Sequence, residues 1–313
     1  MTKNILRISL LLLLAASLCS SALAAEGERL RLATTTSLQD TGLLDLIKEE
    51  FDQSHNVSLD VVSGGTGIAI QYGERGDVDV LLVHDKVREL KFIQEGHGLE
   101  RRCIAYNYFY LVGPENDPAG VQGMNASRAL ATIMARGMED PDSVKFVSRG
   151  DDSGTHAREK LLWKNAGYNY SDIYNNSEAN STKSWYIDAG QGMGATLNMA
   201  SELQAYTLTD MSTFMAYQGN LSLVSLIEGG DELLNVYVGM VVNPEKHPDV
   251  NCLLANEFID YLVSDEGQEL IASFGTEKFG KPLFFPARGN CDVIGCSEEE
   301  CAMPTAASCT AAA

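Results

Sequence analysis

Residues 146–160 read FVSRGDDSGTHAREK. An apolar strand end, Phe146 and Val147, passes into a helix-like run through residues that are nearly all glycine or hydrogen-bonding groups. A strand that hands over to a helix in this way is the repeating unit of an α/β fold. The junction leaves two interpretations open: an ordinary loop with a helix cap at Ser153, or a loop that binds a ligand with many acceptor atoms.

Short strands and amphipathic helices alternate along the chain before this junction. The expected strands are residues 30–33, 57–62 and 78–83, and the expected helices between and after them are 43–51, 66–74 and 87–94. After the junction the pattern continues with helices at 155–164 and 194–204 and a strand at 205–208. This order predicts an α/β fold with mostly parallel sheets flanked by helices.

Two longer extended runs, 103–113 and 235–242, interrupt the alternation and each stops just before or at a proline. They predict two lobes joined by two crossing strands that act as a hinge, with the ligand cleft between the lobes. We therefore assign residues 25–113 and 236–286 to lobe I and residues 114–235 to lobe II. Residues 287–313 form a Cys-rich C-terminal tail that we expect to lie outside the core.

The first residues predict export from the cytoplasm. Lys3 and Arg7 precede an apolar run, and small residues at positions 22 and 24 suit a cleavage site, so residues 1–24 are expected to be a signal peptide. A lipid anchor at Cys19 is disfavoured because the bulky Leu18 precedes it. We expect the mature protein in the periplasm.

The net charge and the cysteines indicate which binding partners and which metal sites are unfavourable for this protein. A formal net charge of −20 argues against nucleic acid or an anionic membrane surface. In an exported protein cysteines usually form disulfides, and the spacing here lacks the C-x2-C pairs of a zinc site. We expect disulfides and no metal-cation site among the cysteines that follow the signal peptide: Cys103, Cys252, Cys291, Cys296, Cys301 and Cys309.

Three strand-to-helix junctions share one chemistry. They are TTTS at 34–37, SGGTG at 63–67 and RGDDSGT at 149–155. Each places hydroxyls and flexible backbone at the carboxyl end of a strand, which is the edge of an open α/β sheet where ligands bind. Helix starts offer free amide donors and a partial positive charge, and Arg149 adds a formal one. Each loop alone also fits a simple cap or turn, but three together predict one anion held between the lobes.

These segments resemble the solute-binding proteins of Tup-type tungstate ABC importers. The similarity rests on TTTSLQDTGLL (34–44), SGGTG (63–67), VDVLLVHD (78–85), SRGDDSGTH (148–156) and YTLTD (206–210), and it runs from residue 29 to about 286. Wider relatives bind molybdate, sulfate and phosphate and share the type II periplasmic binding fold. The resemblance implies a monomeric protein, without catalysis or cofactor, that captures tungstate and delivers it to a membrane permease driven by a cytoplasmic ATPase.

Carried onto this sequence, the resemblance implies a set of oxyanion-binding residues that donate through hydroxyls, backbone amides and one guanidinium. They are Thr35, Thr36, Ser37, Ser63, Gly65, Thr66, Arg149, Ser153, Gly154 and Thr155, with Thr209 as a further candidate at the rim of the cleft. The Cys-rich tail departs from the family pattern and is assigned no part in binding.

Protonation separates the candidate anions. Tungstate, molybdate and sulfate only accept hydrogen bonds near neutral pH, whereas monohydrogen phosphate needs an acceptor in its site. Molybdate and phosphate therefore remain alternative ligands, and Asp85 is the residue whose carboxylate would supply that acceptor. We expect Asp85 and Asp151 to face away from the cleft and Asp152 to pair with Arg149.

A secreted serine hydrolase is the more distant alternative. It would need Ser153 as a nucleophile with a histidine base within hydrogen-bond reach, and His156 is the nearest candidate in sequence. The glycine-x-serine-x-glycine elbow is absent. We therefore expect a binding protein rather than an enzyme.

Overall fold

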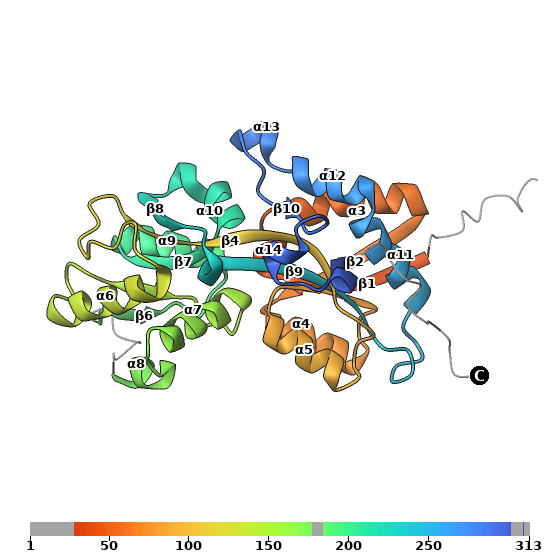
Figure 1. Ribbon diagram of the computed structural model, residues 1–313, viewed down its shortest axis with the longest axis horizontal. Helices are drawn as coiled ribbons and strands as arrows, with labels where there is room; N and C mark the ends of the chain where they lie inside the picture. The colour runs from red at the N-terminus through yellow and green to blue at the C-terminus, as the bar shows by residue number, and fades with distance from the viewer. Residues whose placement is uncertain (1–27, 177–183, 302–308, 310–313) are drawn as a thin grey trace, which may run out of the picture.

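The computed structural model describes residues 28–176, 184–301 and 309 of the 313-residue chain. The predicted signal peptide, with Cys19, lies outside the described residues. The strands follow the order β2-β1-β3-β9-β4-β7-β5-β6, and β8 and β10 both pair with β4. Figure 1 shows the helices and strands gathered in two lobes that β4 and β9 connect. The predicted α/β architecture with helices flanking a mixed sheet is confirmed.

Lobe I is built on three parallel strands, β1 (Glu28–Thr35), β2 (Val57–Gly64) and β3 (Val80–Val83). The register pairs Thr35 with Gly64, so the carboxyl ends of β1 and β2 lie at the same sheet edge. The other elements are α2 (Thr36–Gln39), α3 (Leu43–His55), α4 (Thr66–Arg75), α5 (Lys86–Gln94), α11 (Cys252–Val263), α12 (Asp265–Ser273), α13 (Thr276–Phe279) and β10 (Phe285–Pro286).

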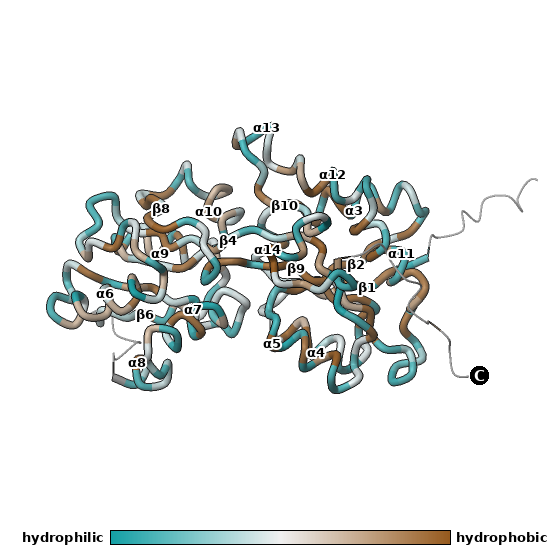
Figure 2. Tube along the Cα trace, in the orientation of Figure 1, coloured by the Kyte–Doolittle hydropathy of each residue, from teal (hydrophilic) through white to brown (hydrophobic). Residues whose placement is uncertain are grey.

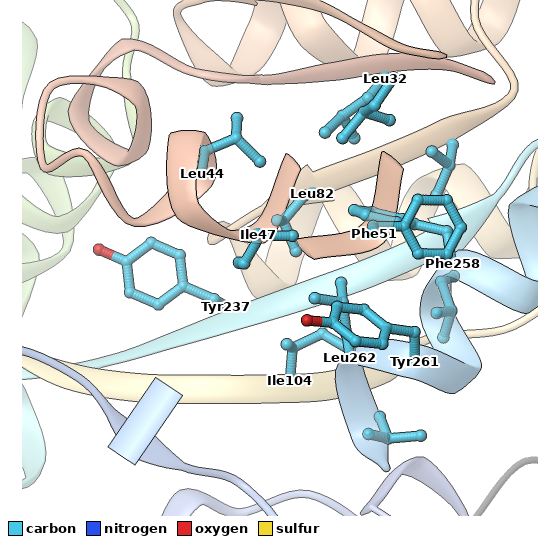
Figure 3. Packing of buried hydrophobic residues seen from close by; sticks show 14 of the residues in the cluster. Leu32, Leu44, Ile47, Phe51, Leu82, Ile104, Tyr237, Phe258, Tyr261 and Leu262 are labelled. Carbon is cyan, nitrogen blue, oxygen red and sulfur yellow. The ribbon is translucent and has the colours of Figure 1, made fainter. Parts of the chain in front are cut away.

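The core of lobe I forms because α3 and α11 each turn one apolar face toward the sheet. Helix α3 buries Leu44, Ile47 and Phe51 at the spacing of successive helical turns. Phe51 meets Phe258 of α11 edge to face, with ring centroids 5.0 Å apart, and Figure 3 shows this packing. Each fully buried side chain of this size contributes about 1.5–3 kcal/mol, so this packing holds the strand edge in place.

Lobe II repeats the same plan around β5 (Phe146–Ser148), β6 (Tyr186–Asp188) and β7 (Tyr206–Asp210), which run parallel to one another. Its helices are α6 (Ala126–Glu139), α7 (Gly154–Asn165), α8 (Tyr170–Asn176), α9 (Met193–Leu203) and α10 (Met211–Tyr217). Strand β8 (Leu223–Glu228), which the sequence did not reveal, lies antiparallel to β4. Its residues lack a strict apolar–polar alternation, so periodicity gave no signal there.

The two lobes share a strand. β4 (Arg102–Pro114) pairs with β9 (Leu234–Val241) through its first half and with β7 and β8 through its second half. Figure 2 colours much of these central strands as hydrophobic, in keeping with their burial. The predicted pair of crossing strands is confirmed. The residue boundaries of the lobes given above stay a prediction.

The expectation that the tail lies outside the core is wrong for residues 287–301. Ala287 and Ile294 are buried in one apolar cluster with β3 and β9, and α14 (Cys291–Ile294) and α15 (Glu298–Cys301) follow. The reason is covalent as well as apolar, because Cys296 is bonded to Cys103 of β4. The rest of the tail, apart from Cys309, lies outside the described residues.

The predicted disulfides are present. They join Cys103 with Cys296, Cys252 with Cys309 and Cys291 with Cys301. Within the described ranges, no helix combines the length and the apolar character that a membrane crossing requires.

The disulfide between Cys103 and Cys296 should stabilise the fold more than the one between Cys252 and Cys309. The first spans a sequence separation of 193 and the second one of 57, and a cross-link that closes a longer loop removes more entropy from the unfolded chain. Replacing each pair by alanines should lower the free energy of unfolding by about 2–5 kcal/mol, with the longer loop losing about 1 kcal/mol more. Denaturant unfolding of both double variants measures this, and the reverse order would contradict it.

Candidate functional site

The structure brings the three predicted loops together between the lobes. The loops after β1 and β2 come from lobe I, and the loop after β5 comes from lobe II. A Cβ atom added to Gly65 would lie 3.1 Å from the backbone oxygen of Asp151, so the second and third loops are in contact across the cleft. Parallel strands that end at one edge of each lobe thus present their helix starts to one common site.

Arg149 is the cationic group at this meeting point. Only 2% of its surface is exposed. Its Nη2 donates to Thr36 Oγ1 of lobe I at 3.3 Å and to the carboxylate of Asp151. Its Nε and Nη1 are buried and have no hydrogen-bond partner among the described residues. Unpaired buried donors on a charged group are costly, so these two nitrogens favour an anion beside them.

Two threonine hydroxyls are, like these arginine nitrogens, buried without a hydrogen-bond partner among the described residues. Thr66 Oγ1 at the start of α4 and Thr155 Oγ1 at the start of α7 are buried without a partner among the described residues. They come from opposite lobes. A hydroxyl can donate one hydrogen bond to an oxyanion, so each lobe contributes at least one unsatisfied donor of this kind.

Thr35, Ser37 and Ser153 carry hydroxyls that are buried but have hydrogen-bond partners. Thr35 Oγ1 caps α2 by accepting from the Leu38 amide at 3.4 Å and lies 3.2 Å from Ser37 Oγ. Ser153 Oγ caps α7 by accepting from the His156 amide at 3.2 Å. An oxygen that accepts in a cap keeps its own proton free for donation.

The helix starts add backbone donors. Gly65 precedes α4 and offers no side-chain cap, so the first amides of this helix lack a side-chain acceptor. The α7 start is equally close to the cleft, because Gly154 is buried against the His84 ring of lobe I. Both helix termini direct partial positive charge at the same site, which is the usual way proteins hold an anion with few formal charges.

Two left-handed residues shape the Arg149 loop. Gly150 has φ +62° and Asp152 has φ +58°. A Cβ atom at Gly150 would lie 1.5 Å from Asp188 Oδ1, so only glycine fits there. The short-range turn that results brings the Asp151 carboxylate back onto the arginine that precedes it.

The expected partners of the acidic residues need correction. Asp151, which we expected to face away, pairs with Arg149 and accepts from the Ser153 amide at 3.2 Å. Asp152, which we expected to pair with Arg149, accepts instead from Arg88 of lobe I through both its carboxylate and its backbone oxygen. The left-handed conformation of Asp152 explains the exchange, because it turns that side chain outward to lobe I.

Asp85 is occupied by the helix that it begins. Its Oδ1 accepts from the amides of Val87 and Arg88 at 3.2 and 3.3 Å, and its Oδ2 lies 3.5 Å from Arg88 Nε. Both oxygens are therefore engaged by α5. The carboxylate that a monohydrogen phosphate would need is not offered to the cleft by this residue.

The structure places two predicted residues, Ser63 and Thr209, differently from the others. Ser63 lies near the end of β2 and is exposed. Thr209 is fully buried within β7, and its hydroxyl donates to the Asp210 backbone oxygen at 3.1 Å. Thr209 is thus an interior strand residue rather than one at an exposed rim.

His84 and Asn235 were not among the predicted binding residues, yet both lie behind the site. His84 Nε2 is 3.2 Å from Ser37 Oγ, and His84 Nδ1 is 2.8 Å from Asn235 Oδ1. His84 follows β3 at the same sheet edge as the loops after β1 and β2, which is the one signal that could have identified it. Burial lowers the pKa of His84, an effect that the nearby Asp210 carboxylate opposes.

His156 does not act as a base for Ser153. Its Nδ1 accepts from the Asp152 amide at 3.1 Å, and its Nε2 lies 2.8 Å from Tyr170 Oη. Burial also lowers the pKa of His156 to about 4. Ser153 therefore lacks the partner that a nucleophilic serine requires.

The sequence is similar to a known protein family and to proteins of known ligand. A PBP superfamily domain matches residues 22–266. The tungstate-binding protein TupA of Peptoclostridium acidaminophilum is 38% identical over 291 residues, which cover 90% of this chain and 97% of that protein.

Two solved structures are also similar. The tungstate ABC transporter structure from Geobacter sulfurreducens is 43% identical with a TM-score of 0.67, covering 79% of this chain and 99% of that one. The tungstate-binding protein TupA from Desulfovibrio alaskensis G20 is 41% identical with a TM-score of 0.68, covering 83% and 98%.

Replacing Gly154 by alanine should hold the lobes apart. The added Cβ would lie 2.6 Å from His84 Cε1, so α7 could not approach lobe I as closely as it does here. Small-angle scattering of the Gly154→Ala variant with saturating oxyanion should give a larger radius of gyration than wild type. Gly192→Ala is the matched control, because Gly192 precedes α9 in the same lobe and has no atom within 4 Å of the added Cβ. Equal radii for both variants would contradict this.

Proposed function

Because this chain belongs to the PBP superfamily and, within it, to the family of the tungstate-binding TupA proteins, we propose that it is the tungstate-binding subunit of an ABC importer. Members of this family are transport proteins and not enzymes. Ser37, His84 and Asn235 do follow the hydroxyl–imidazole–amide order of a hydrolase triad, but in this family such a cleft binds a solute.

One observation carries the proposal. Arg149, Thr66 and Thr155 each hold buried donor atoms without a partner among the described residues, and they come from both lobes. A tetrahedral oxyanion between the lobes would accept from all three. The predicted neighbours Thr35, Thr36, Ser37, Gly65, Ser153 and Gly154 would complete the donor set from the same three loops.

The donor set suits an anion without a proton. Tungstate accepts hydrogen bonds at every oxygen, and the unpaired groups at this site are a guanidinium and hydroxyls, which can all donate. Phosphate is the weaker alternative, since both oxygens of Asp85 are engaged by α5. Molybdate has the same charge and shape as tungstate and stays the competing ligand.

The mechanism is closure without chemistry. An anion that accepts from Arg149 and Thr155 in lobe II and from Thr66 in lobe I stabilises the closed arrangement by its differential affinity for it. The interlobe hydrogen bond from Arg88 to the Asp152 backbone oxygen, 2.8 Å long, forms at the edge of the same contact. The closed form is the one that the permease would recognise.

The wider setting follows from the family. Proteins of this class bind an oxyanion and work with a membrane permease and an ATPase. We extend this to a monomer that acts in the periplasm after removal of residues 1–24, with no cofactor.

Isothermal titration of the ligand-stripped protein tests the proposal. Tungstate should bind one to one, with molybdate next and with sulfate and phosphate weaker. The missing acceptor for its proton costs phosphate about 1–3 kcal/mol, roughly 5- to 150-fold, and a poorer fit weakens sulfate. Phosphate as the tightest ligand would place the chain among phosphate binders. Absence of heat with all four anions would refute the proposal.

Arg149→Ala should weaken tungstate binding by about 2–5 kcal/mol, roughly 30- to 5,000-fold, because it removes a buried charged donor from the ligand. Arg149→Lys should recover little, since an ammonium cannot reproduce the planar fork. Arg136→Ala, an exposed arginine on α6 of the same lobe, is the matched control and should bind like wild type. Unchanged affinity in Arg149→Ala would remove this residue from the site.

A further inference from the structure

A buried chain of hydrogen bonds runs from the site into the hinge. Ser37 Oγ lies 3.2 Å from His84 Nε2, and His84 Nδ1 lies 2.8 Å from Asn235 Oδ1 of β9. Asn235 Nδ2 donates to Asn107 Oδ1 of β4 at 2.9 Å, and Asn107 Nδ2 donates to Ser212 Oγ of lobe II at 3.3 Å. Each of these side chains is buried, with at most 6% of the residue exposed.

This series of hydrogen bonds determines which nitrogen of His84 carries a proton. Asn235 Nδ2 is committed to two acceptors, Asn107 Oδ1 and Tyr237 Oη at 3.0 Å, so the amide oxygen is the atom that faces His84. An oxygen only accepts, and His84 Nδ1 must therefore hold the proton. In a neutral imidazole, Nε2 then has no proton and accepts a hydrogen bond from the Ser37 hydroxyl.

A neutral His84 therefore conflicts with a bound dianion. If Ser37 donates to His84 Nε2, it presents a lone pair rather than a proton to the cleft. The site also lacks net positive charge to balance a dianion, because the positive charge of Arg149 is paired with the Asp151 carboxylate. A buried dianion needs compensation, and the pair of Arg149 and Asp151 is neutral overall.

We propose that His84 is a positioning residue that takes up a proton when tungstate binds, so that its Nε2–H donates to Ser37 and the Ser37 hydroxyl turns to the ligand. The inference rests on the proposed function. The imidazolium then supplies the second positive charge at the site. His84 does so from behind Ser37, where its ring also touches Gly154 of lobe II.

The surroundings of His84 permit this change. Burial keeps the pKa of the empty-site imidazole low, Asp210 and Asp85 oppose this, and Arg149 adds to it. The rings of Tyr237 and Phe109 face it with centroids at 4.9 and 6.2 Å. The cavity on its far side, about 180 Å³, is lined by further charged groups: Lys86, Glu89, Arg101, Arg158 and Asp231.

The sign of the pH dependence follows from proton linkage. In the free protein His84 is neutral at neutral pH, because its pKa is lowered. A dianion next to Ser37 favours the charged form and raises that pKa in the complex. The complex then binds more protons than the free protein. Affinity is therefore highest at low pH, falls by up to about tenfold per pH unit between the His84 pKa of the free protein and that of the complex, and levels off above the latter.

Titration calorimetry of wild type with tungstate at pH 7 tests this, in two buffers whose ionisation enthalpies differ. The buffer dependence of the heat gives the number of protons exchanged, and we expect uptake approaching one proton per tungstate. His84→Gln should take up none and bind at least about tenfold more weakly, with affinity independent of pH between 6.5 and 8. His55→Gln, which removes an exposed histidine on α3, is the matched control and should behave as wild type.

Each outcome decides the matter. Tungstate binding without proton uptake in wild type would overturn the role of His84 while leaving the proposed function intact. Equal uptake in His84→Gln would place the proton elsewhere and overturn it too. No tungstate binding would remove the proposed function and this inference with it. If His84→Gln does not fold, nitrogen NMR of labelled wild type replaces it: protonation of His84 Nε2 on tungstate addition supports the inference, and an unchanged ring contradicts it.

Discussion

Arg149 is buried with two guanidinium nitrogens that find no partner in the part of the chain that the structure describes, and the rest of the site conforms to this constraint. Arg149 can stay buried only because Asp151 and Thr36 satisfy its third nitrogen and because something between the lobes can satisfy the other two. The need for a glycine at 150, the left-handed Asp152 and the approach of α7 to lobe I all follow from placing that one side chain where both lobes reach it.

Much of this arrangement was readable from residue patterns, because helix starts, glycines and hydroxyls at strand ends have a direct physical meaning. What could not be read was decided by three-dimensional partners. Asp151 and Asp152 exchange roles because of a local left-handed turn, and His84 matters only through Ser37 and an asparagine 151 positions away. The placement of the tail depends on a disulfide partner almost two hundred residues earlier, which spacing alone does not identify.

The protein carries a net charge of −20 and is proposed to hold a dianion, and its local hydrogen bonds resolve the conflict. Three carboxylates near the cleft are engaged by other groups: Asp85 by the start of α5, Asp152 by Arg88, and Asp210 by the hydroxyls and amide at the start of α10. The fourth, Asp151, is paired with Arg149. Neutral dipoles act at short range, whereas distant surface charges are screened by salt. A strongly acidic surface is therefore compatible with an anion site that consists of donors.

The shared strand has a mechanical consequence. β4 passes from one lobe to the other without a loop, and its register shifts once near Cys103, in the part paired with β9, and once near Leu111, soon after it changes partners. Register shifts are where a strand bends, while the paired segments between them stay stiff. The lobes are thus joined by a continuous, paired strand rather than by a flexible loop. Because a strand that stays paired resists bending, we expect the lobes to open over a limited range and to close again on the same two surfaces.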